Sequence, residues 1–190
     1  MKICKVAAQK DLSSFINFPY RHYRQDPIWI PPLRDEQRGQ FDTKRNPLLE
    51  HCTWQLYLLE DQGRVIGRIA AFYDHLAQEF WREKVGHFGY FECVEDPEAG
   101  HLLLETAREW LKQEGCTAMR GPWSFVSQEW GSVVEGFTPS PVIMGPYNPP
   151  YYNKLYSNYG LEKVKDLLCW EISVEKGYQV PERILSLTEA

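Results

Sequence analysis

The fold is decided by one stretch, residues 84–116, which reads KVGHFGYFECVEDPEAGHLLLETAREWLKQEGC. Its first part, residues 85–94, is apolar and aromatic and predicts a strand. After the acidic turn at residues 95–98, apolar residues recur at helical spacing as far as Leu111, and Gly115 is suited to end that helix. Many α/β proteins hold an anionic cofactor at such a helix N-terminus, directly after a buried strand.

The remaining residues predict further strands and helices around this unit. A helix is predicted to begin at Asp11, an N-cap residue that precedes apolar residues at helical spacing. Residues 53–59 and 65–73 are β-branched, aromatic and apolar, and the short turn between them predicts a hairpin. Further elements are predicted as strands at 2–7, 118–123 and 161–174, a helix or turn at 127–135, and a helix at 148–158 that Gly160 ends.

The length of 190 residues predicts one domain, residues 1–175, with 176–190 as a polar tail or the start of a further region. Residues 25–52 form a proline-rich arm within that domain. Pro27, Pro31 and Pro32 exclude a regular helix at its start, where we expect Trp29 to pack the arm onto the domain.

Composition narrows the class of protein. The formal net charge of -5 argues against nucleic acid or an anionic membrane as the main partner, because both require a basic surface. The five cysteines are scattered and never form a C-x-x-C pair, so they predict neither a disulfide framework nor a metal site. With no apolar run long enough to span a membrane and no secretory leader, we expect a cytoplasmic protein.

Several motifs resemble the GNAT superfamily of acyl-CoA N-acyltransferases. They are GRIAA at 67–71, LLExAxxWLxxxGC at 103–116 and LYxxxGL at 155–161. A bacterial group of GNAT-like proteins is also similar at FPYRHY, DPIWIPPL, RNPLLEH, VEGF and PYNPPYY. The likeness covers residues 12–172. It implies an α/β (α+β) fold in which helices flank a mixed, mostly antiparallel central sheet.

The resemblance implies an N-acyltransferase that moves an acyl group from acetyl-CoA or another acyl-CoA to a small-molecule amine. In the superfamily, strand amides that correspond to Cys93 and Val94 hold pantetheine, and a Q/R-x-x-G-x-G/A turn holds the pyrophosphate. Here only Gly100 agrees with that turn, and Glu95 and Glu98 place carboxylates where a phosphate would lie. The alternative is a non-catalytic GNAT-fold module that binds a small ligand or a protein without CoA.

Two catalytic residues follow from the resemblance and from strand position. Tyr156 matches the tyrosine that protonates the departing thiolate, and its alternative role is an amphipathic tyrosine under the last strand. Glu92, beside the position of the bulge that the superfamily has in this strand, is a candidate general base, and its alternative is an exposed or salt-bridged carboxylate. His87 is more typical of a structural histidine, and Cys93 of an inert buried thiol.

A substrate pocket is predicted from aromatic and acidic residues near the middle of the chain. Trp123, Glu129, Trp130 and Tyr147 could surround an amine through cation–π and charge contacts. The alternative interpretation is that these residues lie on a solvent-exposed face of a helix and form no pocket. We expect no metal, and the resemblance leaves a homodimer open.

Overall fold

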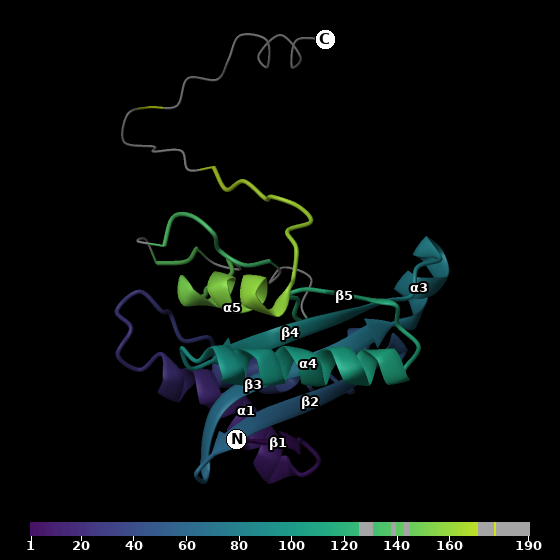
Figure 1. The fold of residues 1–190 in the computed structure, drawn as a ribbon, viewed down its shortest axis with the longest axis horizontal. Coiled ribbons are helices and arrows are strands. Elements are labelled where there is room, and N and C mark those ends of the chain that lie inside the picture. Colours follow the sequence, from purple (N-terminus) through teal and green to yellow (C-terminus); the bar gives the residue numbers. More distant parts are fainter. Residues whose placement is uncertain (126–130, 138–139, 143–144, 171–176, 178–190) are drawn as a thin grey trace.

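Five strands form one sheet in the residues that the computed structural model describes, namely 1–125, 131–137, 140–142, 145–170 and 177 (Figure 1). The spatial order is β1-β2-β3-β4-β5. The strands are β1 (Lys2–Lys5), β2 (Cys52–Asp61), β3 (Arg64–Asp74), β4 (Val85–Cys93) and β5 (Ala118–Arg120). The first four are antiparallel neighbours and β5 is parallel to β4, so the predicted mixed, mostly antiparallel sheet is confirmed.

Helices cover both faces of this sheet. In Figure 1, α4 crosses in front of the sheet and α1 lies behind it. The helices are α1 (Gln9–His22), α2 (Arg34–Gly39), the 3-10 helix η1 (Pro47–His51), α3 (His75–Trp81), α4 (Pro97–Gln113) and α5 (Tyr151–Tyr159). Within the described residues, no helix is both long and apolar enough to cross a membrane.

The alternation of side chains along β3 divides the core into two layers. Ile69 and Ala71 pack with α4 and α5, whereas Ala70 and Phe72 pack on the opposite face with Phe15 of α1. Successive strand residues point to opposite faces, so a central strand covered on both sides must be apolar throughout. Each layer therefore receives its own set of side chains from the same strand.

Most of the predicted elements are present, although several differ in their bounds. The hairpin is confirmed as β2 and β3. The first helix begins at Gln9 rather than after Asp11, because the Asp11 carboxylate accepts the Ala8 N–H at 3.1 Å from within the first turn. Pro19, a residue type that usually breaks or kinks a helix, lies inside α1, which continues to His22.

The predicted strand at 161–174 is wrong for residues 161–170, which contain no strand. Its apolar side chains are exposed, including Val164, Leu168 and Trp170. The physical reason is that no neighbouring strand pairs with this segment in the part of the chain that the structure describes. Residues 171–174, and most of the helix or turn predicted at 127–135, lie outside that part.

β4 contains a β-bulge about halfway along its length. The register with β3 shifts between Arg68 and Ala70, opposite Tyr90, whose φ of 49° marks a β-bulge. β5 pairs with β4 only as far as His87, and the chain after β5 then crosses β4 closely. The Trp123 N–H donates to Phe88 O at 2.9 Å, and a Cβ on Gly89 would lie 1.4 Å from Trp123 O.

Replacing Gly89 with alanine should therefore destabilise the protein strongly. We expect Gly89→Ala to lower the free energy of unfolding by more than about 3 kcal/mol, because backbone must move to admit the methyl group. Urea unfolding followed by circular dichroism measures this. The control is Gly39→Ala, where the nearest contact is the flexible Arg45 side chain at 3.1 Å. A cost at Gly89 as small as that at Gly39 would contradict the close crossing.

Candidate functional site

The outer edge of β4 is closed at Cys93 by two tyrosines of α5. The Cys93 N–H donates to Tyr152 Oη at 2.9 Å, and the Tyr151 hydroxyl donates to Cys93 O at 2.7 Å. Both Cys93 groups point away from β3, because the neighbouring Val94 N–H pairs with Ile66 O at 3.0 Å. We call Tyr151 and Tyr152, with their hydrogen bonds to the backbone of Cys93, the tyrosine clasp.

The C-terminal end of α1 supports the clasp from the other side. His22 Nε2 lies 3.1 Å from Tyr151 Oη, and the Tyr23 and Tyr152 hydroxyl oxygens are 2.8 Å apart. Burial raises the pKa of Tyr152 and of Tyr23 well above their usual range, so both hydroxyls keep their protons. Burial lowers the pKa of His22, which favours the neutral imidazole.

The hydrogen bonds also define the tautomer of His22. The Tyr151 hydroxyl has one proton and donates it to Cys93 O. A neutral His22 must then donate from Nε2 to Tyr151 Oη, which leaves Nδ1 with a free lone pair. Nδ1 has no hydrogen-bond partner among the described residues, so His22 presents a proton acceptor beside the end of β4.

An aromatic group surrounds this end of α1. It consists of Tyr20, Tyr23, Trp29 and Tyr147, with ring centroids 5.2 to 5.5 Å apart in successive pairs. The Tyr147 hydroxyl donates to the Asp26 carboxylate. As expected, Trp29 packs the proline-rich arm onto the domain. Carboxylate and aromatic faces together are the kinds of group that bind an ammonium ion.

Glu92 forms a salt bridge, which is one of its two alternative interpretations from the sequence. Its carboxylate accepts hydrogen bonds from Arg68 Nε and, at 3.1 Å, from Arg68 Nη2. Arg68 is 2% exposed and also donates to Phe15 O at 2.8 Å. The bidentate guanidinium thus engages both oxygens of the carboxylate. The role of Glu92 as general base stays a prediction.

Tyr156 points into the apolar layer below β4. Its ring packs against Phe91 at 5.1 Å and Phe88 at 5.8 Å. Burial raises the pKa of Tyr156 well above its usual range, and the nearby Glu92 and Cys93 act in the same direction. The hydroxyl is therefore protonated at neutral pH, as a general acid requires, and this role also stays a prediction.

The turn before α4 does not fit the pyrophosphate of CoA. Asp96 Oδ1 accepts the N–H of Glu98 at 2.8 Å and of Ala99 at 3.3 Å, and Pro97 has no N–H. The Gly100 N–H donates to Asp96 O at 3.0 Å. The first amides of the helix are thus bonded within the protein, next to carboxylates that repel a phosphate.

The strand amides predicted to hold pantetheine are engaged in the same way. The Cys93 N–H belongs to the tyrosine clasp and the Val94 N–H to the sheet. Burial raises the pKa of the Cys93 thiol to about 12, with Asp96 adding to the effect, so this cysteine is an inert thiol as expected.

Two members of the predicted amine pocket, Trp123 and Tyr147, are among the described residues and have different ring neighbours. Trp123 packs against His87, with ring centroids 4.8 Å apart, whereas Tyr147 joins the aromatic group at α1. Glu129 and Trp130 lie outside the described residues. Tyr147 therefore keeps its predicted kind of environment, aromatic and acidic, but with Tyr23 and Asp26 as its neighbours.

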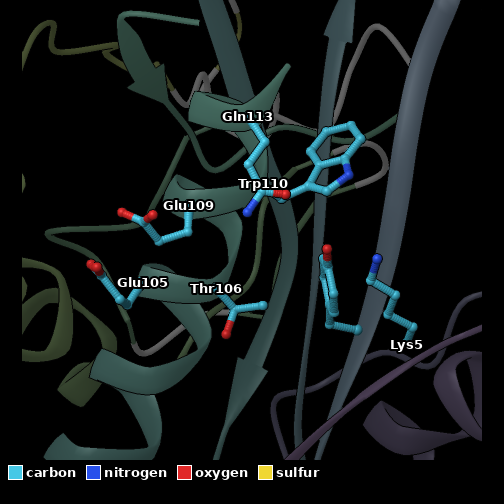
Figure 2. A pocket seen from close by; sticks show the side chains of 7 residues that line it. Lys5, Glu105, Thr106, Glu109, Trp110 and Gln113 are labelled. Atoms are coloured by element: carbon cyan, nitrogen blue, oxygen red, sulfur yellow. The ribbon is translucent and has the colours of Figure 1, made fainter. Parts of the chain in front are cut away.

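The hollows found in the described structure lie away from these residues. One, of about 380 Å³, lies between α4 and the β1–β2 edge of the sheet (Figure 2). Figure 2 shows Trp110 over the strands and the carboxylates of Glu105 and Glu109 pointing away from Lys5. Another, of about 440 Å³, lies between α4, β5 and the end of α5. Neither is lined by a predicted site residue.

His51, Cys52 and Asp74 bring potential metal ligands within 4.8 Å of one another. Hydrogen bonds account for the cluster, because Asp74 Oδ1 caps α3 and accepts from His51 Nδ1 at 2.9 Å. Burial raises the pKa of the Cys52 thiol to about 12, with Asp74 adding to the effect, so the thiolate that a metal needs is disfavoured.

Comparison with solved structures identifies the fold. The alignment with a probable acetyltransferase covers 92% of this chain and 98% of that protein, at a TM-score of 0.50 and 12% identity. The alignment with a predicted acetyltransferase with acetyl-CoA from Clostridium acetobutylicum covers 94% of this chain and 99% of that protein, at a TM-score of 0.50 and 12% identity. The alignment with an aminoglycoside acetyltransferase from an uncultured soil sample covers 91% of this chain and 95% of that protein, at a TM-score of 0.51 and 11% identity. The chain has the GNAT fold.

Comparison of sequences adds two relatives, and no family model matches the chain. Protein YghO of Escherichia coli is 37% identical over 85% of this chain and 42% of its own length. The bacterial ceramide synthase of Caulobacter vibrioides is 31% identical over 90% of this chain and 45% of its own length. The chain therefore spans less than half the length of the curated relatives it matches.

His87 provides a pH-dependent test of the structure. Burial lowers its pKa to about 4, and Arg120 contributes in the same direction. The unfolded imidazole binds a proton near pH 6.5, so the folded state loses stability as the pH falls from about 6.5 to 4. The loss is up to about 1.4 kcal/mol per pH unit. His87→Phe should remove this component, as measured by urea unfolding at several pH values.

The same substitution removes a buried polar atom, because His87 Nδ1 has no hydrogen-bond partner among the described residues. We therefore expect His87→Phe to be at least as stable as the parent at pH 5. The exposed His101→Gln serves as the control and should keep the parent's pH slope. If the unfolding free energy of His87→Phe depended on pH as steeply as that of the parent, the lowered pKa of His87 would be contradicted.

The closed turn predicts that acetyl-CoA does not bind at the start of α4. Adding it at millimolar concentration should leave the amide exchange of residues 93–100 unaffected. The matched variant is Asp96→Ser, in which serine can still cap α4 but the negative charge of the carboxylate is removed. Exchange protection at residues 98–100 in the parent would overturn the prediction.

Proposed function

We propose that this chain is a domain of an N-acyltransferase, which transfers an acyl group to an amine. The observation that carries the proposal is the GNAT fold, found together with 31% identity to a protein named bacterial ceramide synthase. Ceramide is a lipid in which an acyl group is joined to an amine through an amide bond. Amide formation is the reaction for which the GNAT resemblance also argues.

The described residues support a binding place for the amine at the aromatic group of α1. Asp26 supplies a carboxylate, and Trp29 and Tyr147 supply aromatic faces, which together favour an ammonium group. This place adjoins the tyrosine clasp through the Tyr23–Tyr152 hydrogen bond. The amine nitrogen would thereby lie close to His22 and the end of β4.

Once the bound ammonium group has released one proton to solvent, acyl transfer from the neutral amine requires two further proton transfers. The amine nitrogen forms a bond to the acyl carbon and loses a proton, while the bond from that carbon to the leaving group breaks. His22 Nδ1 accepts the nitrogen's proton, since this imidazole is neutral and Glu92 is held by Arg68. Tyr156, which keeps its proton, supplies one to the leaving group.

A second candidate function is a GNAT-fold module that binds a ligand or a protein and does not use CoA. It is favoured by the Asp96 cap and by the tyrosine clasp, which occupy the amides that the superfamily offers to CoA. Under the first proposal, the acyl donor is not held at the turn before α4.

The two functions are separated by assaying the full-length protein with acyl-CoAs of several chain lengths and a panel of amines, including long-chain amino alcohols. Mass spectrometry detects the amide product. His22→Gln should lower kcat about 100-fold, the usual scale for loss of a general base, with little change in KM. The acidic limb of the parent's pH–rate profile, where His22 becomes protonated, should also disappear.

His75→Gln is the matched control, since His75 is exposed and hydrogen-bonds Thr53 at the other end of β3. It should leave kcat and the pH profile unchanged. Equal activity of His22→Gln and the parent would remove His22 from the mechanism. Absence of any amide product with the whole panel would favour the binding module.

A further inference from the structure

Helix α3 exposes large apolar side chains at one end of the molecule. Leu76 is 56% exposed, Phe80 is 76% and Trp81 is 70%. The Phe80 and Trp81 rings contact each other edge to face at 4.9 Å. Figure 1 shows α3 projecting past the end of the sheet, so these side chains form a convex protrusion.

Polar contacts, not core packing, hold this helix in place. None of its residues is buried. Asp74 Oδ1 caps its first turn, accepting from Leu76 N at 2.8 Å and Ala77 N at 3.1 Å. Gln78 Nε2 donates to Val85 O at 3.4 Å. Because the polar side of α3 faces the protein, the apolar side chains are left to contact something else.

The charges around α3 balance, but two of the cations are unpaired. Arg82, Lys84 and Arg120 are cationic, against Asp74, Glu79 and Glu83, and Glu83 is paired with Arg120 at 3.2 Å. Arg82 and Lys84 have no ion pair among the described residues. The net charge of -5 argued against an anionic surface as partner, whereas these two cations beside the exposed aromatic side chains favour one at this end of the molecule.

We propose that the α3 tip, defined as Leu76, Phe80, Trp81, Arg82 and Lys84, docks on the surface of an anionic membrane. Tryptophan and phenylalanine favour the boundary between lipid headgroups and acyl chains, and adjacent cations bind acidic headgroups. A fluid lipid surface accepts a convex tip, whereas a protein partner would need a matching groove. The observations therefore favour lipid over protein.

Docking at this tip leaves the candidate functional site uncovered. β4 begins at Val85, shortly after α3, and ends at Cys93, eight residues further on, which corresponds to about 26 Å of strand. The tyrosine clasp and the aromatic group of α1 lie at that far end. The α3 tip is thus an anchor, and the proposal does not depend on the proposed acyl transfer.

The test is co-sedimentation of the full-length protein with vesicles. Vesicles of phosphatidylcholine with phosphatidylglycerol should bind the parent, and pure phosphatidylcholine should bind it more weakly. Phe80→Glu combined with Trp81→Glu should weaken binding at least about ten-fold, since it removes apolar side chains and adds negative charge. Arg82→Gln with Lys84→Gln should abolish the difference between the two vesicle types.

A matched control is Ile30→Glu with Leu33→Glu, which changes charge equally at exposed apolar residues elsewhere, 57% and 66% exposed. This variant should bind vesicles as the parent does. Equal loss in both double variants would mean a general charge effect and would overturn the proposal. If the parent does not bind vesicles, the tip would be assigned to a protein contact instead. The same assignment would follow if the sedimentation coefficient fell in Phe80→Glu/Trp81→Glu alone.

Discussion

The backbone of β4 beyond its bulge must find hydrogen-bond partners, and this constraint organises the functional end of the molecule. β5 pairs with β4 only as far as His87, so the outward N–H and C=O of Cys93 have no strand beside them. A buried amide without a partner costs about 1–3 kcal/mol. The first turn of α5 supplies two tyrosine hydroxyls instead, and the end of α1 supports those hydroxyls through His22 and Tyr23. One strand edge thus determines where α5 and α1 meet.

The same bonds decide what this GNAT fold can bind. Strand amides and a helix N-terminus attract a thioester arm and a phosphate when their N–H groups are free. Here Tyr152, Ile66 and Asp96 accept those N–H groups, so a ligand would have to replace several hydrogen bonds that the protein already makes. The fold and the cofactor preference of a superfamily are separable, because the fold depends on packing and the cofactor on a few unpaired donors.

The fold was largely predictable from sequence, and the site was not. Period-two and helical patterns are local, which is why the hairpin, β4 and α4 follow from residues 53–116 alone. The Asp96 cap also has a local sequence signal, an Asp-Pro pair before a helix. The clasp joins residues 58 and 59 positions apart, and its bonds to α1 join residues 129 apart, which no local pattern encodes. His22 and Tyr151 stood in quoted motifs, but neither spacing nor residue type indicated that they meet.

The direction of hydrogen bonds around Cys93 gives this end of the molecule a defined polarity. The Cys93 N–H fixes Tyr152 as an acceptor, and Cys93 O fixes Tyr151 as a donor. Tyr151 then accepts from His22 Nε2, so the carbonyl of a buried strand residue sets the tautomer of a histidine on α1. Protonating His22 adds a proton at Nδ1 and leaves this chain of bonds unchanged. The clasp can therefore stay closed while His22 gains or loses a proton, which is the property that a general base at a rigid site requires.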